Sequence, residues 1–122
     1  MEETMNFRTV LTYVLLMLFM LAGGTALSQN MCNSDICVVQ FNAGWNEANG
    51  VDYLDELTDC SVMSVNIEDG TYQADYDIVV VPTIIVFNGK EVERFQGNIM
   101  MKIEATRKEV QSVVDEIIYS DF

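Results

Sequence analysis

Three cysteines are the residues best suited to chemistry in this 122-residue chain, which contains no histidine. A cysteine thiolate can attack a disulfide or bind a metal ion, so Cys32, Cys37 and Cys60 are the first candidates for a reactive site. The spacing of Cys32 and Cys37 matches no redox motif with a known mechanism, and a zinc site without histidine would need aspartate ligands. Serine nucleophiles such as Ser61 and Ser64 have no histidine base to activate them. Thiol–disulfide exchange is the catalytic chemistry left to consider.

An acidic stretch, 69–77, is the next candidate, because its aspartates could coordinate a hard cation. It lacks the alternating oxygen ligands and the terminal glutamate of an EF-hand loop. A solvated acidic turn is the better interpretation, so we expect no metal site and no cofactor.

The elements that position these residues are clearest at 76–98. Asn88-Gly89 separates two runs, Thr83–Phe87 and Glu91–Phe95, and Asn-Gly between such runs is a strong hairpin signal because both turn positions need positive φ. Pro82 is the only proline, and it has no N–H for a strand ladder, so we place it at the start of the first of these strands.

Two more strands are predicted before the hairpin, at Ile36–Phe41 and Ser61–Ile67. We expect a helix from Asn46 to about Thr58, a short helical turn at 71–76, and a last helix from Asn98 to about Tyr119. This order predicts an α/β fold with a mixed four-stranded sheet flanked by helices on both faces.

The sequence resembles the thioredoxin-like superfamily at three places. These are Phe41–Trp45, Val65–Glu68 and the segment from Val81-Pro82-Thr83 to Gly89. The resemblance spans 36 to about 118 and implies a minimal thioredoxin-like fold that lacks the N-terminal strand and helix of full thioredoxins. It also implies that Pro82 follows a cis peptide bond and faces the family's redox site.

That redox site is degenerate in this sequence. Where the family has Trp-Cys-x-x-Cys, Trp45 is followed by Asn46-Glu47-Ala48-Asn49, so Asn46 replaces the nucleophile and Asn49 the resolving thiol. The buried aspartate of the family falls at Gln40, whose amide cannot titrate, and a common lysine falls at Ser64. The resemblance therefore implies a redox-dead thioredoxin fold, with no catalytic residue.

The N-terminus has the pattern of an export signal. Residues 10–22 are apolar, and small residues follow, with Ala26 and Ser28 at the −3 and −1 positions of a cleavage site. We predict a signal peptide at 1–28 and a single small domain at 29–122 in a periplasmic, extracellular or lumenal compartment. An uncleaved segment 9–27 that anchors the protein in a membrane is the alternative.

Export favours a structural disulfide over free thiols. Three pairings are possible. Cys37 lies inside a predicted core strand, so we expect the pairing Cys32–Cys60, with Cys37 buried and reduced.

Charge restricts the partners. The chain has 19 acidic and six basic residues; loss of 1–28 would remove Glu2, Glu3 and Arg8 and leave a net charge of −12. No basic residue lies between 29 and 89. Nucleic acids and anionic membrane surfaces are therefore poor partners.

Two functions remain. The first is a non-catalytic module that binds a neutral or basic polypeptide, as the resemblance to non-catalytic disulfide-isomerase domains implies. Its peptide groove would consist of Trp45, Asn46, Asn49, Val81 and Pro82. The alternative is an accessory thiol–disulfide redox protein that uses Cys32, Cys37 or Cys60.

Overall fold

The computed structural model describes Cys32 and residues 35–120. The predicted signal peptide 1–28, and the alternative anchor 9–27, lie outside the described residues. Within residues 32 and 35–120, no helix is both long and apolar enough to cross a membrane.

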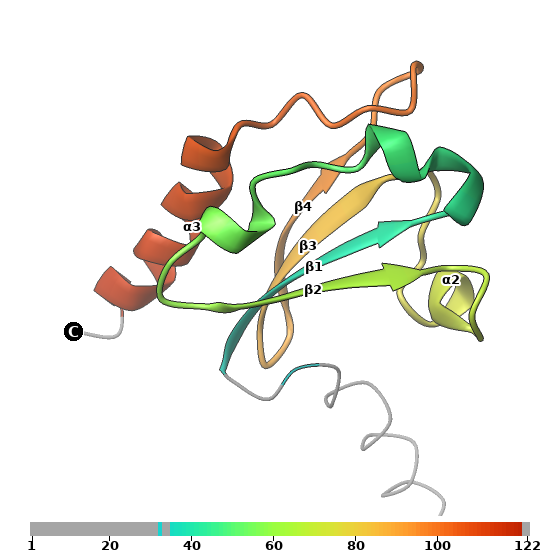
Figure 1. Ribbon diagram of the computed structural model, residues 1–122. Coiled ribbons are helices and arrows are strands. Elements are labelled where there is room, and N and C mark those ends of the chain that lie inside the picture. Colours follow the sequence, from blue (N-terminus) through green and yellow to red (C-terminus); the bar gives the residue numbers. More distant parts are fainter. Residues whose placement is uncertain (1–31, 33–34, 121–122) are drawn as a thin grey trace, which may run out of the picture. The chain divides into compact units, whose positions relative to one another are not determined.

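The centre of the fold is a mixed four-stranded sheet (Figure 1). Its strands are β1 (Ile36–Asn42), β2 (Ser61–Asn66), β3 (Thr83–Asn88) and β4 (Glu91–Gln96), in the spatial order β2-β1-β3-β4. β1 and β2 are parallel, whereas β3 is antiparallel to both β1 and β4. The predicted strands and the predicted hairpin are confirmed, with bounds that differ by one residue.

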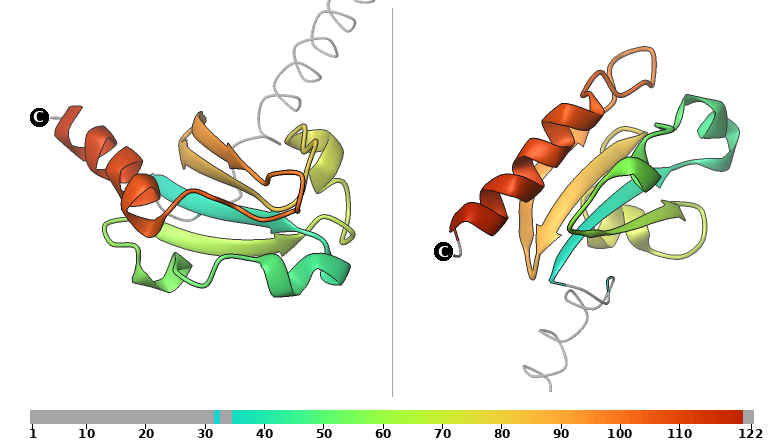
Figure 2. Two further views of the ribbon diagram at one scale, coloured as in Figure 1. Left: turned by 90° about the horizontal axis from the view of Figure 1, so that it is seen from above. Right: turned by 60° about the vertical axis from the view of Figure 1, so that its left-hand side comes forward.

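Helices flank both faces of this sheet, as Figures 1 and 2 show. α3 (Arg107–Ser120) covers one face, and the short α2 (Tyr72–Asp75) lies on the other. Successive strand residues point to opposite faces, so Val38 packs beneath α3 whereas Phe41 contacts Tyr72 and Tyr76. The core cluster beneath α3 consists of Val38, Leu54, Leu57, Ile84, Val86, Val110, Val114 and Ile117.

The predicted helix from Asn46 to Thr58 is wrong. Two short 3-10 helices replace it, η1 (Gly44–Asn49) and η2 (Leu54–Glu56). Asn46 has non-helical backbone angles, φ −112° and ψ 15°, and Gly50 is extended. Side-chain amides bind the backbone in this segment and compete with helical hydrogen bonds, which explains why no continuous helix forms.

The last helix was also predicted to begin too early. Asn98 forms a turn instead of a helix cap: its Oδ1 accepts hydrogen bonds from the N–H groups of Met100 and Lys102, at 2.8 and 3.3 Å. The Asn98 N–H donates to the Lys102 carbonyl at 2.9 Å, and Met101 has a positive φ of 60°. The helix therefore starts only at Arg107, and residues 98–101 form a loop beside η1.

The disulfide differs from the prediction too. Cys32 is bonded to Cys37, with 6.0 Å between the two Cα atoms, and Cys60 is a free thiol, so the predicted Cys32–Cys60 pairing is wrong. Cys37 is buried as predicted, but it is oxidised. Strand alternation places Cys37 on the same face as Phe41, whereas Cys60 packs against the core beneath α3. Cys37 and Cys60 therefore lie on opposite faces of the sheet.

The Val81–Pro82 peptide bond is cis, as predicted. Gly97 lies directly against it, and its N–H donates a 2.8 Å hydrogen bond to the Pro82 carbonyl. A Cβ atom on Gly97 would come within 3.0 Å of the carbonyl oxygens of both Val81 and Pro82. Glycine is required here because backbone atoms leave no room for a side chain.

Gly97→Ala should therefore destabilise the protein, by about 1–3 kcal/mol, because the rigid backbone at Val81 and Pro82 must shift. Urea denaturation checks the value. Gly44→Ala is the matched control, since its new methyl group would meet only the ends of two side chains, at 3.3 and 3.4 Å. Equal losses in the two variants would contradict the packing argument.

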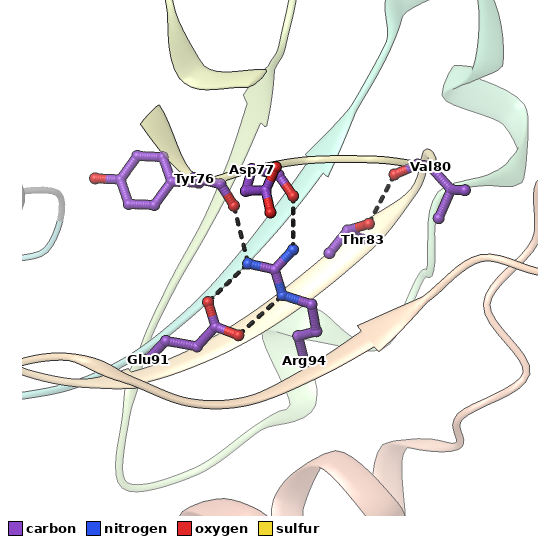
Figure 3. Close-up of polar contacts among 6 residues, drawn as sticks. All are labelled: Tyr76, Asp77, Val80, Thr83, Glu91 and Arg94. Atoms are coloured by element: carbon purple, nitrogen blue, oxygen red, sulfur yellow. Dashed lines mark hydrogen bonds and ion pairs between the residues drawn. The ribbon is translucent and has the colours of Figure 1, made fainter. Parts of the chain in front are cut away.

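Arg94 holds the segment that leads from α2 to the cis-proline (Figure 3). Its guanidinium donates to the carbonyl oxygens of Tyr76 and Asp77, both at 2.9 Å. It also pairs with both carboxylate oxygens of Glu91, at 2.7 and 2.9 Å. The hydrogen bond from Arg94 lowers the pKa of Glu91. Five donors on one rigid fork allow these contacts at once, which a lysine cannot reproduce.

Arg94→Lys should lower the free energy of unfolding by about 1–2 kcal/mol at neutral pH. Because the pKa of Glu91 is lowered in the folded state, its contribution is present above the ordinary carboxyl pKa and is lost as pH falls through the lowered value. The difference between wild type and variant should therefore narrow in acid, as measured by denaturation at several pH values. A difference that does not change with pH would contradict a role for Glu91.

Candidate functional site

A pocket of about 570 Å³ lies beyond the carboxyl end of β1. It is formed where η1, the segment before β3 and the loop between β4 and α3 meet, and Figure 1 shows these three segments at one end of the sheet. We call this pocket the groove. Its lining residues are Ala43, Trp45, Ile67, Glu68, Gln73, Ile78, Val79, Val80, Val81, Asn98, Ile99 and Met101.

Large apolar side chains are exposed around the groove. Trp45 is 67% exposed, Val79 71%, Ile99 97% and Met101 42%. Most of the Trp45 side chain is therefore exposed to solvent, where a ligand can contact it. Exposed apolar side chains gathered at one place are typical of a surface that another molecule covers.

An amide cluster formed by Asn42, Asn46 and Asn49 lies beside the groove. Asn46 is 4% exposed, and its Oδ1 accepts a 2.7 Å hydrogen bond from Asn49 Nδ2. Its Nδ2 donates to Asn42 Oδ1 at 3.1 Å and to the Met101 carbonyl at 3.2 Å. Asn42 Nδ2 in turn donates to the Asn46 carbonyl at 3.0 Å. These hydrogen bonds connect β1 and η1 with the loop that contributes Ile99 and Met101 to the groove.

Gln40 has a structural contact of its own. The side chain is 6% exposed, and its Oε1 accepts a 2.8 Å hydrogen bond from the Val51 N–H. The neutral amide thus holds the chain where it leaves η1. The Gln40 amide does not titrate, so it cannot act as an acid or base toward a thiol. Asn46 and Asn49 are not thiols.

The structure brings only part of the predicted groove together. Trp45 and Val81 both line it. Asn46 is buried beside it, Asn49 lines a neighbouring hollow, and the ring of Pro82 is buried. The Val81 N–H and C=O form no hydrogen bond within the described part of the chain, although the residue is buried and its carbonyl oxygen lies against Gly97.

Sequence reasoning missed Val79, Ile99 and Met101. The signal that could have found the last two is the apolar run Ile99-Met100-Met101, which directly follows Gly97-Asn98. The predicted helix from Asn98 to about Tyr119 places both methionines in a helix and so hides this signal.

Charge around the groove is negative. Among the described residues, Glu68 is the only ionisable one that lines the groove, and its Oε1 accepts a 2.9 Å hydrogen bond from the Gly44 N–H. Glu47 is exposed in the first turn of η1. A neutral or basic ligand fits these carboxylates better than an acidic one.

The cysteines lie away from this site. Cys37 is near the start of β1, whereas the groove lies beyond the strand's other end. Cys60 immediately precedes β2, and burial raises the pKa of its thiol, with further contributions from Asp59 and Asp115. A raised pKa makes the nucleophilic thiolate scarcer.

No protein-family model matches the sequence, and no curated protein matches it. The fold, however, is similar to solved thioredoxins. A mutant thioredoxin from Halobacterium salinarum has a TM-score of 0.55 and 21% identity, over 74% of this chain and 80% of the other. A mutant thioredoxin from Entamoeba histolytica has a TM-score of 0.52 and 22% identity, over 79% and 92%. Thioredoxin-2 of the malaria parasite, described as a component of its protein secretion machinery, has a TM-score of 0.53 and 15% identity, over 71% and 89%. The fold of this chain is therefore thioredoxin-like.

Proposed function

We propose that this thioredoxin-like domain is a non-catalytic module that binds an extended segment of another polypeptide in an exported compartment. The observation that carries the proposal is the groove, with Trp45 and Ile99 exposed on its rim. The amide cluster supports the non-catalytic part, since Asn46 and Asn49 are hydrogen-bonded to each other in place of a dithiol.

The form of the ligand follows from the backbone of Val81. Its N–H forms no hydrogen bond in the described residues, so a carbonyl group of an extended peptide can accept from it while apolar side chains of the peptide contact Trp45 and Met101. The carboxylates of Glu47 and Glu68 and the acidic body of the domain favour neutral or basic peptides. Association should slow as salt is raised, because electrostatic steering is screened beyond about 10 Å at 0.1 M.

A peptide array probed with the purified protein tests the proposal. The array should contain short apolar peptides that differ only in whether lysine or glutamate flanks the apolar residues. We expect retention of the neutral and lysine-flanked peptides, and weaker retention of these when the salt concentration is raised. Preference for the glutamate-flanked peptides would place the functional surface elsewhere.

One observation favours a second function, accessory thiol–disulfide exchange. The Cys32–Cys37 disulfide is a possible substrate for an attacking thiolate, and Cys32 is only partly buried. Against this function, Cys37 is 1% exposed and the third cysteine, Cys60, has a raised pKa.

Insulin reduction by dithiothreitol should proceed at the same rate with and without this protein. The physical reason is that Cys37 is 1% exposed and that burial raises the pKa of the Cys60 thiol, which makes its nucleophilic thiolate scarce near neutral pH. Precipitation of the insulin B chain, followed by turbidity, measures the rate. Acceleration that disappears after alkylation of the reduced protein would establish the redox function instead.

A further inference from the structure

The two edge strands of the sheet differ in how well they are protected against pairing with a strand of another chain. β4 forms one edge; it carries Glu91, Glu93 and Arg94, and its register with β3 is irregular at Val86/Phe87. β2 forms the other edge, and its sequence SVMSVN contains no charge and no proline. Charged side chains and bulges are the usual devices that keep an edge strand from pairing with another chain. β4 has both, and β2 has neither.

The backbone of β2 offers hydrogen bonds on its outer side. Ile67 N–H donates to the Asn42 carbonyl of β1 at 2.9 Å, and Asn42 is in register with Asn66. In a parallel ladder, alternate residues direct both backbone groups to the same neighbour, so Val62 and Ser64 point their N–H and C=O away from β1. Within the described residues, no strand other than β1 pairs with β2.

Two hollows with acidic lining residues lie along the β2 edge. One of about 260 Å³ is lined by Val62 and Ser64 together with Asp52 and Asp55. A second, of about 440 Å³, continues along Ser64 and includes Glu47. In the described part of the chain, no basic residue lines either hollow. The basic residues of the domain all lie between 90 and 108, in or after the β3–β4 turn.

We propose that the outer edge of β2 binds an extended, basic segment of a partner protein by strand addition. The partner's backbone pairs with Val62 and Ser64, and its lysine or arginine side chains contact Asp52 and Asp55. A second copy of this chain fits poorly, because antiparallel pairing of two β2 strands would bring two acidic surfaces together. Val62, Ser64, Asp52 and Asp55, which carry this proposal, do not line the groove, so the proposal does not depend on it.

A synthetic peptide of alternating lysine and valine tests the proposal, with binding followed by fluorescence anisotropy of a label on the peptide. We expect saturable binding. The affinity should fall about tenfold when the nitrogens of alternate peptide residues are methylated, since this removes the backbone donors along the side of the peptide that faces β2. Ser64→Pro should weaken binding by a similar factor, whereas Ser64→Ala should leave it unchanged. Asp52→Asn combined with Asp55→Asn should weaken it several-fold.

Hydrogen exchange of the protein locates the peptide. The Val62 and Ser64 amides should exchange rapidly in the protein alone and become protected when the peptide is added, and Trp45→Ala should not change this. Equal binding of the methylated peptide, or of a peptide of alternating glutamate and valine, would overturn the proposal. So would protection of both amides before peptide is added, because the chain itself or a second copy would then already cover the edge.

Discussion

Asn46→Leu should lower the free energy of unfolding by about 2–4 kcal/mol, although leucine is similar in size and more apolar. The loss comes from the groups that Asn46 now satisfies. Asn49 Nδ2 and Asn42 Oδ1 each lose a partner, and so does the Met101 carbonyl. Asn46 is 4% exposed, so water cannot readily replace all of these hydrogen bonds. Denaturation in urea gives the value.

Asn49→Leu is the matched control for this variant. Asn49 is more exposed than Asn46 and its side chain makes one hydrogen bond, so we expect a loss of about 1 kcal/mol. Asn46→Leu should also change the environment of Ile99 and Met101, because the hydrogen bond to the Met101 carbonyl holds their loop. If both variants lose the same small amount of stability, the amide cluster is not what holds the groove together.

Trp45→Ala should weaken peptide binding about thirtyfold, equivalent to about 2 kcal/mol, and should leave the stability of the fold nearly unchanged. The side chain is 67% exposed, so folding buries little of it, whereas a peptide in the groove would cover the ring. Tryptophan contacts often supply much of the energy of an interface. Isothermal titration with a peptide retained on the array measures the affinity.

Tyr119→Ala is the control for Trp45→Ala. Tyr119 is 77% exposed on α3 and does not line the groove, so its removal should not affect binding. Equal losses in the two variants would indicate non-specific adhesion of the peptide to exposed aromatic side chains.

The sheet was predictable because its signals are local. Asn88-Gly89 specifies the hairpin, Pro82 marks the start of β3, and the apolar run of β1 indicates a buried strand. Each signal depends on backbone preferences or burial that neighbouring residues do not override. The cis bond before Pro82 came from the resemblance and not from the residue types alone.

The segments around the groove were less predictable because side-chain hydrogen bonds decide their course. Asn46 has the spacing and residue type of a helix cap, yet its amide binds Asn49 and the Met101 carbonyl. Asn98 likewise binds N–H groups of its own turn and does not start a helix. The pairing of Cys32 with Cys37 depends on which face of the sheet each thiol occupies, and spacing alone did not reveal it.

The fluorescence of Trp45 tests the central claim most directly, since this is the only tryptophan in the chain. The protein is titrated with a labelled peptide retained on the array, and binding is measured independently by anisotropy. We predict a blue shift of the tryptophan emission that saturates together with the anisotropy, and the loss of both signals in Val81→Asp. Binding that saturates while the Trp45 emission stays unchanged would contradict the claim that the groove is the binding surface.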